Sequence, residues 1–205
     1  ERDWFPTCYR AGGTIMDPVS SRWVDNWFPF DYSNRAPLSL PSLVDWSTGI
    51  NEWKLYHPDT EDFRQTGAGK RRMARCLDLV TNVSIFADND IEAAFKQAHA
   101  GQTAILSCFD HDYRDIADRI HEFLDRIHHI ASKYPDVPWQ YAGPSEAIYR
   151  YLSVNSPPRL DIEIYRTANQ VDIWSTAPLF QSIPWLTVRT PDGQIRHIEE
   201  GVLRR

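Results

Sequence analysis

Helical and strand-like segments alternate along the first 155 residues, and this alternation constrains the fold more than any other feature. Residues 88–100 place apolar side chains at helical spacing and end at Gly101, and residues 115–134 form a longer amphipathic pattern. Between them, residues 103–109 make a continuous apolar run, which is typical of a strand buried on both faces. This order predicts an α/β fold with parallel strands.

The other elements expected in this part of the chain are shorter. They are strands or extended segments over residues 4–9, 28–33, 40–46 and 139–142, and helices over residues 20–27, 70–79 and 145–152. Residues 34–69 are rich in Pro, Ser, Gly and Asp and carry little periodicity. A connection of that length is usually a functional loop.

The pattern changes at Asn155-Ser156-Pro157-Pro158. Beyond it, residues 160–164 alternate strictly between apolar and polar, and residues 171–174, 185–188 and 194–198 are further strand candidates. Pro191-Asp192-Gly193 predicts a hairpin turn. We therefore expect two parts: residues 1–156, built from the helix–strand alternation, and residues 157–205, a small antiparallel β unit.

Composition excludes several classes of partner. The 205 residues carry a formal net charge of -6, which argues against a nucleic-acid surface, and no apolar run approaches the roughly 20 residues of a membrane span. The first residues lack the layout of a signal peptide. Three cysteines without C-x-x-C spacing favour buried reduced thiols and a reducing, cytoplasmic compartment. Eight tryptophans indicate either a large core or aromatic platforms for sugars.

The segment most suited to chemistry follows the apolar run 103–109. There His111 lies between Asp110 and Asp112, at the carboxyl end of a predicted parallel strand, where active sites collect. A histidine beside carboxylates can exchange a proton near neutral pH. The structural alternative is that the aspartates cap the following helix, and a metal site is a further alternative.

Two earlier positions are also candidates. Arg10 ends the first predicted strand, and a guanidinium there can clamp a carboxylate, although a surface arginine beside a turn is an equal alternative. Asp45-Trp46 offers a carboxylate next to an apolar plate, or an ordinary turn. The basic run Lys70-Arg71-Arg72 predicts a solvated helix face, with polyanion binding as the alternative. No nucleotide-binding glycine motif is present.

Taken in order, these segments resemble the carboxyl-terminal half of a polysaccharide deacetylase (NodB-homology) domain. Arg10-Ala11-Gly12-Gly13 is similar to the family's third motif, and Phe30-Asp31-Tyr32-Ser33 to the stretch that follows it. Asp45-Trp46 is similar to the fourth motif. Residues 105–112, which end in His111-Asp112, are similar to the fifth. The resemblance covers about residues 4–152 and implies part of a distorted (β/α) barrel.

The resemblance also implies an activity: metal-assisted hydrolysis of acetyl groups on a sugar. His111 would be the general acid, Arg10 would orient a catalytic aspartate, and Asp45 would tune the histidine. Trp46 would wall the pocket, with Gly12, Gly13 and Asp112 near the substrate. The divalent metal is commonly zinc.

The family's first two motifs, which supply the base and the metal ligands, are not in this sequence and would precede Trp4. We therefore expect no metal site from this chain alone. A missing segment or a second chain would complete the barrel.

Two other functions stay open. One is a non-enzymatic carbohydrate-binding or assembly module, in which Trp23, Trp27, Trp46 and Trp53 stack on glycans. The other is a different α/β hydrolase or a glycosidase that uses Asp110 or Asp112 as its acid.

Overall fold

A small parallel sheet forms the centre of the first part of the chain. In the computed structural model, strands β1 (Cys8–Tyr9), β2 (Phe30–Asn34) and β3 (Arg72–Arg75) pair in the order β1-β2-β3, and both pairings are parallel. The structure describes residues 6–38, 44–79, 87–111, 113–155, 161–167, 170–181 and 186–198. The chain divides into two units, Glu1–Ser156 and Pro157–Arg205.

The sheet continues because one segment changes partner. Strand β4 (Leu77–Asp78) follows β3 after the single residue Cys76 and pairs in parallel with β5 (Cys108–Phe109). The Cys76 backbone N–H still donates to Asn34 of β2, whereas the Leu77 N–H already donates to the carbonyl oxygen of Ser107. Strands β3 and β4 therefore follow one another along a single segment, which pairs with β2 over its first residues and with β5 over its last.

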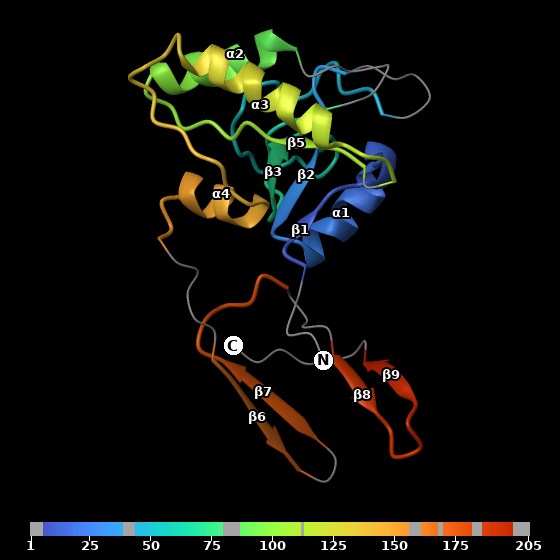
Figure 1. Ribbon diagram of the computed structural model, residues 1–205. Helices are drawn as coiled ribbons and strands as arrows, with labels where there is room; N and C mark the ends of the chain where they lie inside the picture. Colours follow the sequence, from blue (N-terminus) through green and yellow to red (C-terminus); the bar gives the residue numbers. More distant parts are fainter. Residues whose placement is uncertain are drawn as a thin grey trace. The chain divides into compact units, whose positions relative to one another are not determined.

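In the described part of the first unit, four α-helices surround these strands (Figure 1): α1 (Pro18–Trp27), α2 (Asp88–His99), α3 (Ala117–Ala131) and α4 (Pro144–Tyr151). Helices α2 and α3 lie side by side, and their apolar faces share one core with Leu77 of β4. That core consists of Trp53, Leu77, Ile91, Ala94, Phe95, Phe123, Ile127, Ile130 and Val137. The helices expected over residues 88–100, 115–134 and 145–152 are confirmed with shifts at their ends.

Strand β2 is buried on both faces, as the central strand of a parallel sheet should be. Phe30 and Tyr32 pack in one cluster with Ile148 of α4. The alternate residue Asp31 points the other way, toward α1. Strand alternation therefore gives β2 one apolar face and one polar face, both inside the molecule.

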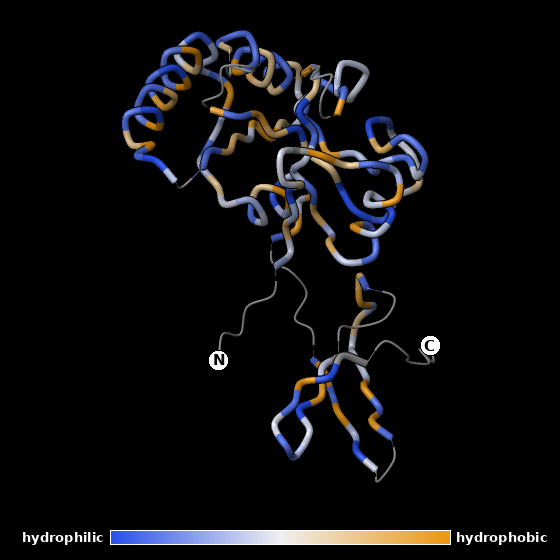
Figure 2. Tube along the Cα trace, turned by 90° about the vertical axis from the view of Figure 1, so that its right-hand side faces the viewer, coloured by the Kyte–Doolittle hydropathy of each residue, from blue (hydrophilic) through white to orange (hydrophobic). Residues whose placement is uncertain are grey.

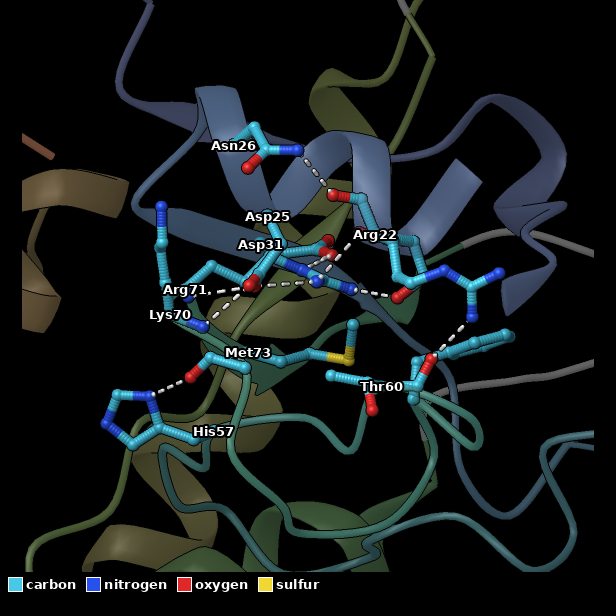
Figure 3. A network of polar contacts seen from close by, with 12 residues as sticks. Arg22, Asp25, Asn26, Asp31, His57, Thr60, Lys70, Arg71 and Met73 are labelled. Atoms are coloured by element: carbon cyan, nitrogen blue, oxygen red, sulfur yellow. Dashed lines mark hydrogen bonds and ion pairs between the residues drawn. The ribbon is translucent and has the colours of Figure 1, made fainter. Parts of the chain in front are cut away.

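The polar face of β2 contains a buried ion-pair network around Arg71 (Figure 3). The Arg71 guanidinium donates to Asp31 Oδ2 at 2.9 Å, to Asp25 Oδ1 at 3.0 Å, and to both the carbonyl and the hydroxyl of Ser21. The Asp31 side chain is fully buried, and that of Arg71 is 1% exposed. These bonds fasten α1 to the sheet.

The prediction of a helix over residues 70–79 is wrong, because this segment forms β3 and β4. The predicted solvated cationic face is wrong with it: Arg71 and Arg75 are buried. Arg75 donates to Asp90 of α2 at 2.6 Å and lies over the Trp53 ring. Carboxylate partners from distant segments stabilise these arginines inside the sheet, and no local pattern reveals those partners.

Other expected elements differ in detail. Residues 139–142 form no strand, and Trp139 and Tyr141 are exposed there. Residues 40–43 of the strand expected over 40–46, and residues 4 and 5 of the first strand, lie outside the described residues. Helix α1 begins earlier than expected, because its N-cap is Asp17, whose side chain accepts from the Ser20 N–H at 2.6 Å.

The second unit contains two antiparallel hairpins. Strands β6 (Ile162–Arg166) and β7 (Val171–Ser175) form one, and β8 (Leu186–Arg189) and β9 (Ile195–Ile198) form the other. Gly193 adopts a φ of 85° in the predicted turn between β8 and β9. Hydrophobic residues run along both hairpins (Figure 2), and Trp174 is 62% exposed.

The described strands form no closed barrel; they form the parallel sheet segments and the two hairpins. No helix in the described part of the chain is both long and apolar enough to cross a membrane.

Candidate functional site

Charged side chains gather where the parallel strands end. We call this group the polar edge: Arg10 after β1, Arg35 after β2, Asp78 at the end of β4, and Asp110, His111 and Arg114 after β5, arranged around Phe109. The carboxyl ends of parallel strands meet on one side of a sheet, which explains why residues distant in sequence converge there.

The Phe109 ring joins two of the predicted catalytic residues. The guanidinium carbon of Arg10 lies 3.9 Å from the ring centroid, a cation–π contact. On the same ring, the His111 imidazole makes an edge contact, with centroids 6.0 Å apart and planes at 87°. Arg10 and His111, about a hundred residues apart in sequence, therefore share one neighbour.

A buried ion pair lies beside them. Arg35 and Asp78 approach to 3.8 Å, and their side chains are 6% and 2% exposed. Burial lowers the pKa of the Arg35 guanidinium, the Asp78 carboxylate opposes that effect, and the nearby positive charge of Arg10 adds to it. Sequence reasoning missed this pair. Arg35 comes directly after a strand, as Arg10 does, and this position could have marked it as a candidate. Asp78 was missed because a helix was predicted over residues 70–79, so its place at the end of a strand was not expected.

Asp110 is held in a fixed geometry next to His111. Its side chain is 3% exposed, and its Oδ1 atom accepts from the Arg114 guanidinium at 2.6 Å and from the His111 backbone N–H at 2.7 Å. Burial raises the pKa of this carboxyl, but those two hydrogen bonds outweigh it, and the pKa lies below its ordinary value. An ionised, ion-paired Asp110 is a poor general acid. Asp112, the other acid considered, lies outside the described residues.

The loop that carries Arg10 is fixed from β2. The buried Ala11 N–H donates to Ser33 Oγ at 2.8 Å, and the Ser33 N–H donates to Asp31 Oδ1 at 2.9 Å. The chain then turns through a short 3-10 helix, η1 (Gly12–Thr14), in which Gly13 has a φ of 59°. Gly12 and Gly13 are exposed. The two motif-like stretches 10–13 and 30–33 are thus directly hydrogen-bonded.

Asp45 and Trp46 occupy a different environment. Trp46 is completely buried and packs edge-on against Phe63, with ring centroids 5.4 Å apart. It therefore belongs to the core and not to an exposed pocket wall. Asp45 is exposed; its carboxylate accepts from the Ser47 N–H, and its carbonyl oxygen accepts from Arg64.

The tryptophans divide between core and surface. Trp53 is buried like Trp46 and donates from its indole to the carbonyl oxygen of Asp90 at 2.8 Å, so neither ring is a sugar platform. Trp23 of α1 is 54% exposed and lies 6.1 Å from the Trp27 ring and 6.5 Å from that of Phe28. We call these three rings the α1 aromatic strip.

The donor set of the described residues does not fit a zinc centre. No group of three His, Cys, Asp or Glu side chains in that part of the chain is arranged to hold a metal ion. At the polar edge, the two carboxylates are engaged by Arg35 and Arg114. We therefore derive no step through a metal from these residues.

Comparison with known proteins gives no relative. No protein-family model, no curated protein sequence and no solved structure matches this chain.

Proposed function

We propose that this chain supplies the later elements of a polysaccharide deacetylase-type hydrolase, whose substrate is an acetylated glycan bound at the polar edge. In this proposal His111 protonates the leaving group, and Arg10 holds a carboxylate. The metal ligands and the catalytic base lie outside these residues, as the resemblance implies.

One observation carries the proposal: Arg10 and His111 contact the same Phe109 ring. They belong to the two motif-like segments to which the family resemblance gives catalytic roles. Two features of the surroundings support it. The loop after Arg10 is bonded to Ser33 in the adjoining motif-like stretch, and the parallel strands lie in chain order, as they do in a (β/α) barrel.

Sugar titrations of the isotope-labelled chain test the proposal. The probes are an N-acetylated chitotetraose and an O-acetylated xylan oligomer, each with its deacetylated counterpart. We expect the acetylated forms to shift the NMR signals of Arg10, Phe109 and His111 more than the deacetylated forms do. Equal shifts with both forms, or none at the polar edge, would refute the proposal.

Matched variants make the titration specific. His111→Gln should weaken binding of the acetylated probe by about tenfold, because His111 contacts the leaving group in this proposal. His121→Gln is the control, because His121 is an exposed histidine of α3. Equal affinities of the two variants would contradict the role proposed for His111.

Metal binding gives a separate test of the proposal that the metal ligands and the catalytic base lie outside these residues. The chain alone should neither retain zinc nor release acetate from either probe. Calorimetry with zinc and an acetate assay measure this. Tight zinc binding together with acetate release would show that these residues are sufficient, and the proposed division would then be wrong.

The α1 aromatic strip supports a second candidate, a glycan-binding module. Trp23 is exposed, and its ring offers an apolar plane for a pyranose beside the partly buried rings of Trp27 and Phe28. The same titration separates the two functions. Shifts confined to Trp23, Trp27 and Phe28, and insensitive to acetylation, would favour binding without hydrolysis.

A further inference from the structure

We propose that Trp139 and Tyr141, together with His128 of α3, form a sugar-binding site separate from the polar edge. The apolar C–H face of a β-linked pyranose stacks there on the two exposed rings. We call these three residues the α3 aromatic corner. The inference goes beyond the proposed function and does not depend on it.

The three rings meet at steep angles. The ring centroids of Trp139 and Tyr141 lie 5.2 Å apart with planes at 87°, and those of His128 and Trp139 lie 5.2 Å apart with planes at 67°. The Tyr141 hydroxyl and the His128 Nε2 atom are 3.2 Å apart and share a hydrogen bond, which holds the tyrosine ring against the helix. Because the corner is already formed, a ligand has little ordering to impose on it.

Packing against α2 fixes the corner from the inside. The Trp139 ring makes an edge contact with buried Phe95, with centroids 6.2 Å apart and planes at 78°. Phe95 in turn stacks on Tyr134, with centroids 5.9 Å apart. Residues 139–142 form no regular element, so these ring contacts set the position of the corner.

Core packing does not account for the two outer rings. Trp139 is 37% exposed and Tyr141 is 59% exposed. Neither belongs to a hydrophobic core cluster of the residues that the structure describes. Tryptophan and tyrosine that are held in place but stay accessible are typical of binding surfaces, because each combines a large apolar ring with a polar group.

The size and the surroundings of the corner favour a sugar over a protein partner. Two exposed rings offer far less area than the roughly 800 Å² per partner of a stable protein interface. The exposed neighbours His129 and Gln140 are polar and can bond the hydroxyl groups around a sugar ring. A β-linked pyranose with equatorial substituents has a flat C–H face of about the area of one aromatic ring. One sugar unit therefore matches the apolar surface of the corner.

The corner and the polar edge lie at opposite ends of α3. The helix begins at Ala117, shortly after Arg114 of the polar edge, and His128 lies in its last turn. With a rise of about 1.5 Å per residue, Ala117 and His128 are roughly 16 Å apart along the helix axis. We therefore expect a sugar bound at the corner to leave the signals of His111 unchanged.

NMR titration of the isotope-labelled full chain tests the inference. The probes are cellotetraose, which carries no acetyl group, and N-acetylated chitotetraose. The indole N–H signal of Trp139 is assigned with a Trp139→Phe variant. We expect both oligomers to shift this signal with similar dissociation constants, because stacking uses the C–H face that they share. Cellotetraose should leave the His111 signals unchanged.

Variants of the two rings measure their contribution. Trp139→Ala and Tyr141→Ala should each weaken cellotetraose binding by about tenfold, whereas Trp139→Phe, which keeps an aromatic ring, should lose less. Trp23→Ala is the matched control, because Trp23 is an exposed tryptophan of the α1 aromatic strip. The control should bind cellotetraose as the unmodified chain does.

An unshifted Trp139 signal with both oligomers would overturn the inference, and so would equal affinities of Tyr141→Ala and Trp23→Ala. The tyrosine variant keeps the test decisive if Trp139→Ala fails to fold, since Tyr141 lies outside the core clusters. Failure of the proposed function has a different signature. The polar edge would then not respond to the acetylated probe, while the corner would still respond to cellotetraose.

Discussion

Removal of Arg71 gives the sharpest test of what holds the first unit together. Arg71→Met keeps the length of the side chain but leaves Asp31, which is fully buried, without its guanidinium partner. Breaking one side of a buried ion pair costs about 3–5 kcal/mol. Asp31 retains the Ser33 N–H, and Asp25 retains the backbone N–H groups of residues 70 and 71, so we expect the lower end, about 3 kcal/mol.

Urea unfolding followed by tryptophan fluorescence measures this loss. A destabilisation of about 3 kcal/mol corresponds to a fall in melting temperature of about 6–12 °C for a chain of this size. The control is Arg22→Met, which removes the exposed ion pair between Arg22 and Glu61 and should change the free energy of unfolding by less than about 1 kcal/mol. If Arg71→Met were as stable as the control, the buried network would not anchor α1 to the sheet.

The pH dependence of the same variant supplies an independent check. Burial raises the pKa of Asp31, and the positive charge of Arg71 opposes that rise, so the substitution should raise the pKa further. A carboxyl group whose pKa is higher in the folded than in the unfolded state takes up its proton in the folded state at a higher pH. As pH falls, this proton uptake stabilises the folded state. The destabilisation by Arg71→Met should therefore shrink between pH 7 and pH 5, and the added substitution Asp31→Asn should abolish that pH dependence.

Three further predictions concern other parts of the first unit. Ser33→Ala removes the acceptor of a buried backbone N–H and should lower the free energy of unfolding by about 1–3 kcal/mol in urea titrations. Cys76 is 3% exposed and Cys108 is exposed, while burial raises the pKa of both thiols, to about 12 and about 11, so iodoacetamide at pH 8 should label Cys108 slowly and spare Cys76 because of access, as read by peptide mass spectrometry. Trp53→Ala opens the core and should cost about 3–5 kcal/mol, whereas Trp23→Ala at the surface should cost under about 1 kcal/mol in the same urea experiment.

Elements governed by local signals could be predicted from the sequence. Helix α2 has a regular apolar face and a glycine just beyond its end, and the hairpin between β8 and β9 has a turn that requires a left-handed glycine. Strands β6 and β7 follow the two-residue alternation closely. In each case the residues that decide the structure lie within a few positions of one another.

Elements that depend on residues distant in the sequence could not be predicted in this way. Residues 72–78 become strands because β2, β5 and the buried acidic partners lie beside them, and none of these is adjacent in sequence. The same reason divides the site. Arg10 and His111 were accessible because each follows a predicted strand, but their common contact with Phe109 depends on the sheet. Trp46 was expected in a pocket wall because of its place in a motif-like stretch, but it is buried in the core. A motif-like position gives no information about burial.

The change of partner at Cys76 has a consequence for how the sheet can fold. A single residue separates β3 from β4. If β3 slipped by one residue against β2, β4 would therefore move by one residue along β5. Such a slip would turn the side chains of both strands to their opposite faces. We therefore expect the two pairings to take their register together, and the backbone positions of Arg10 and His111 to be set with them.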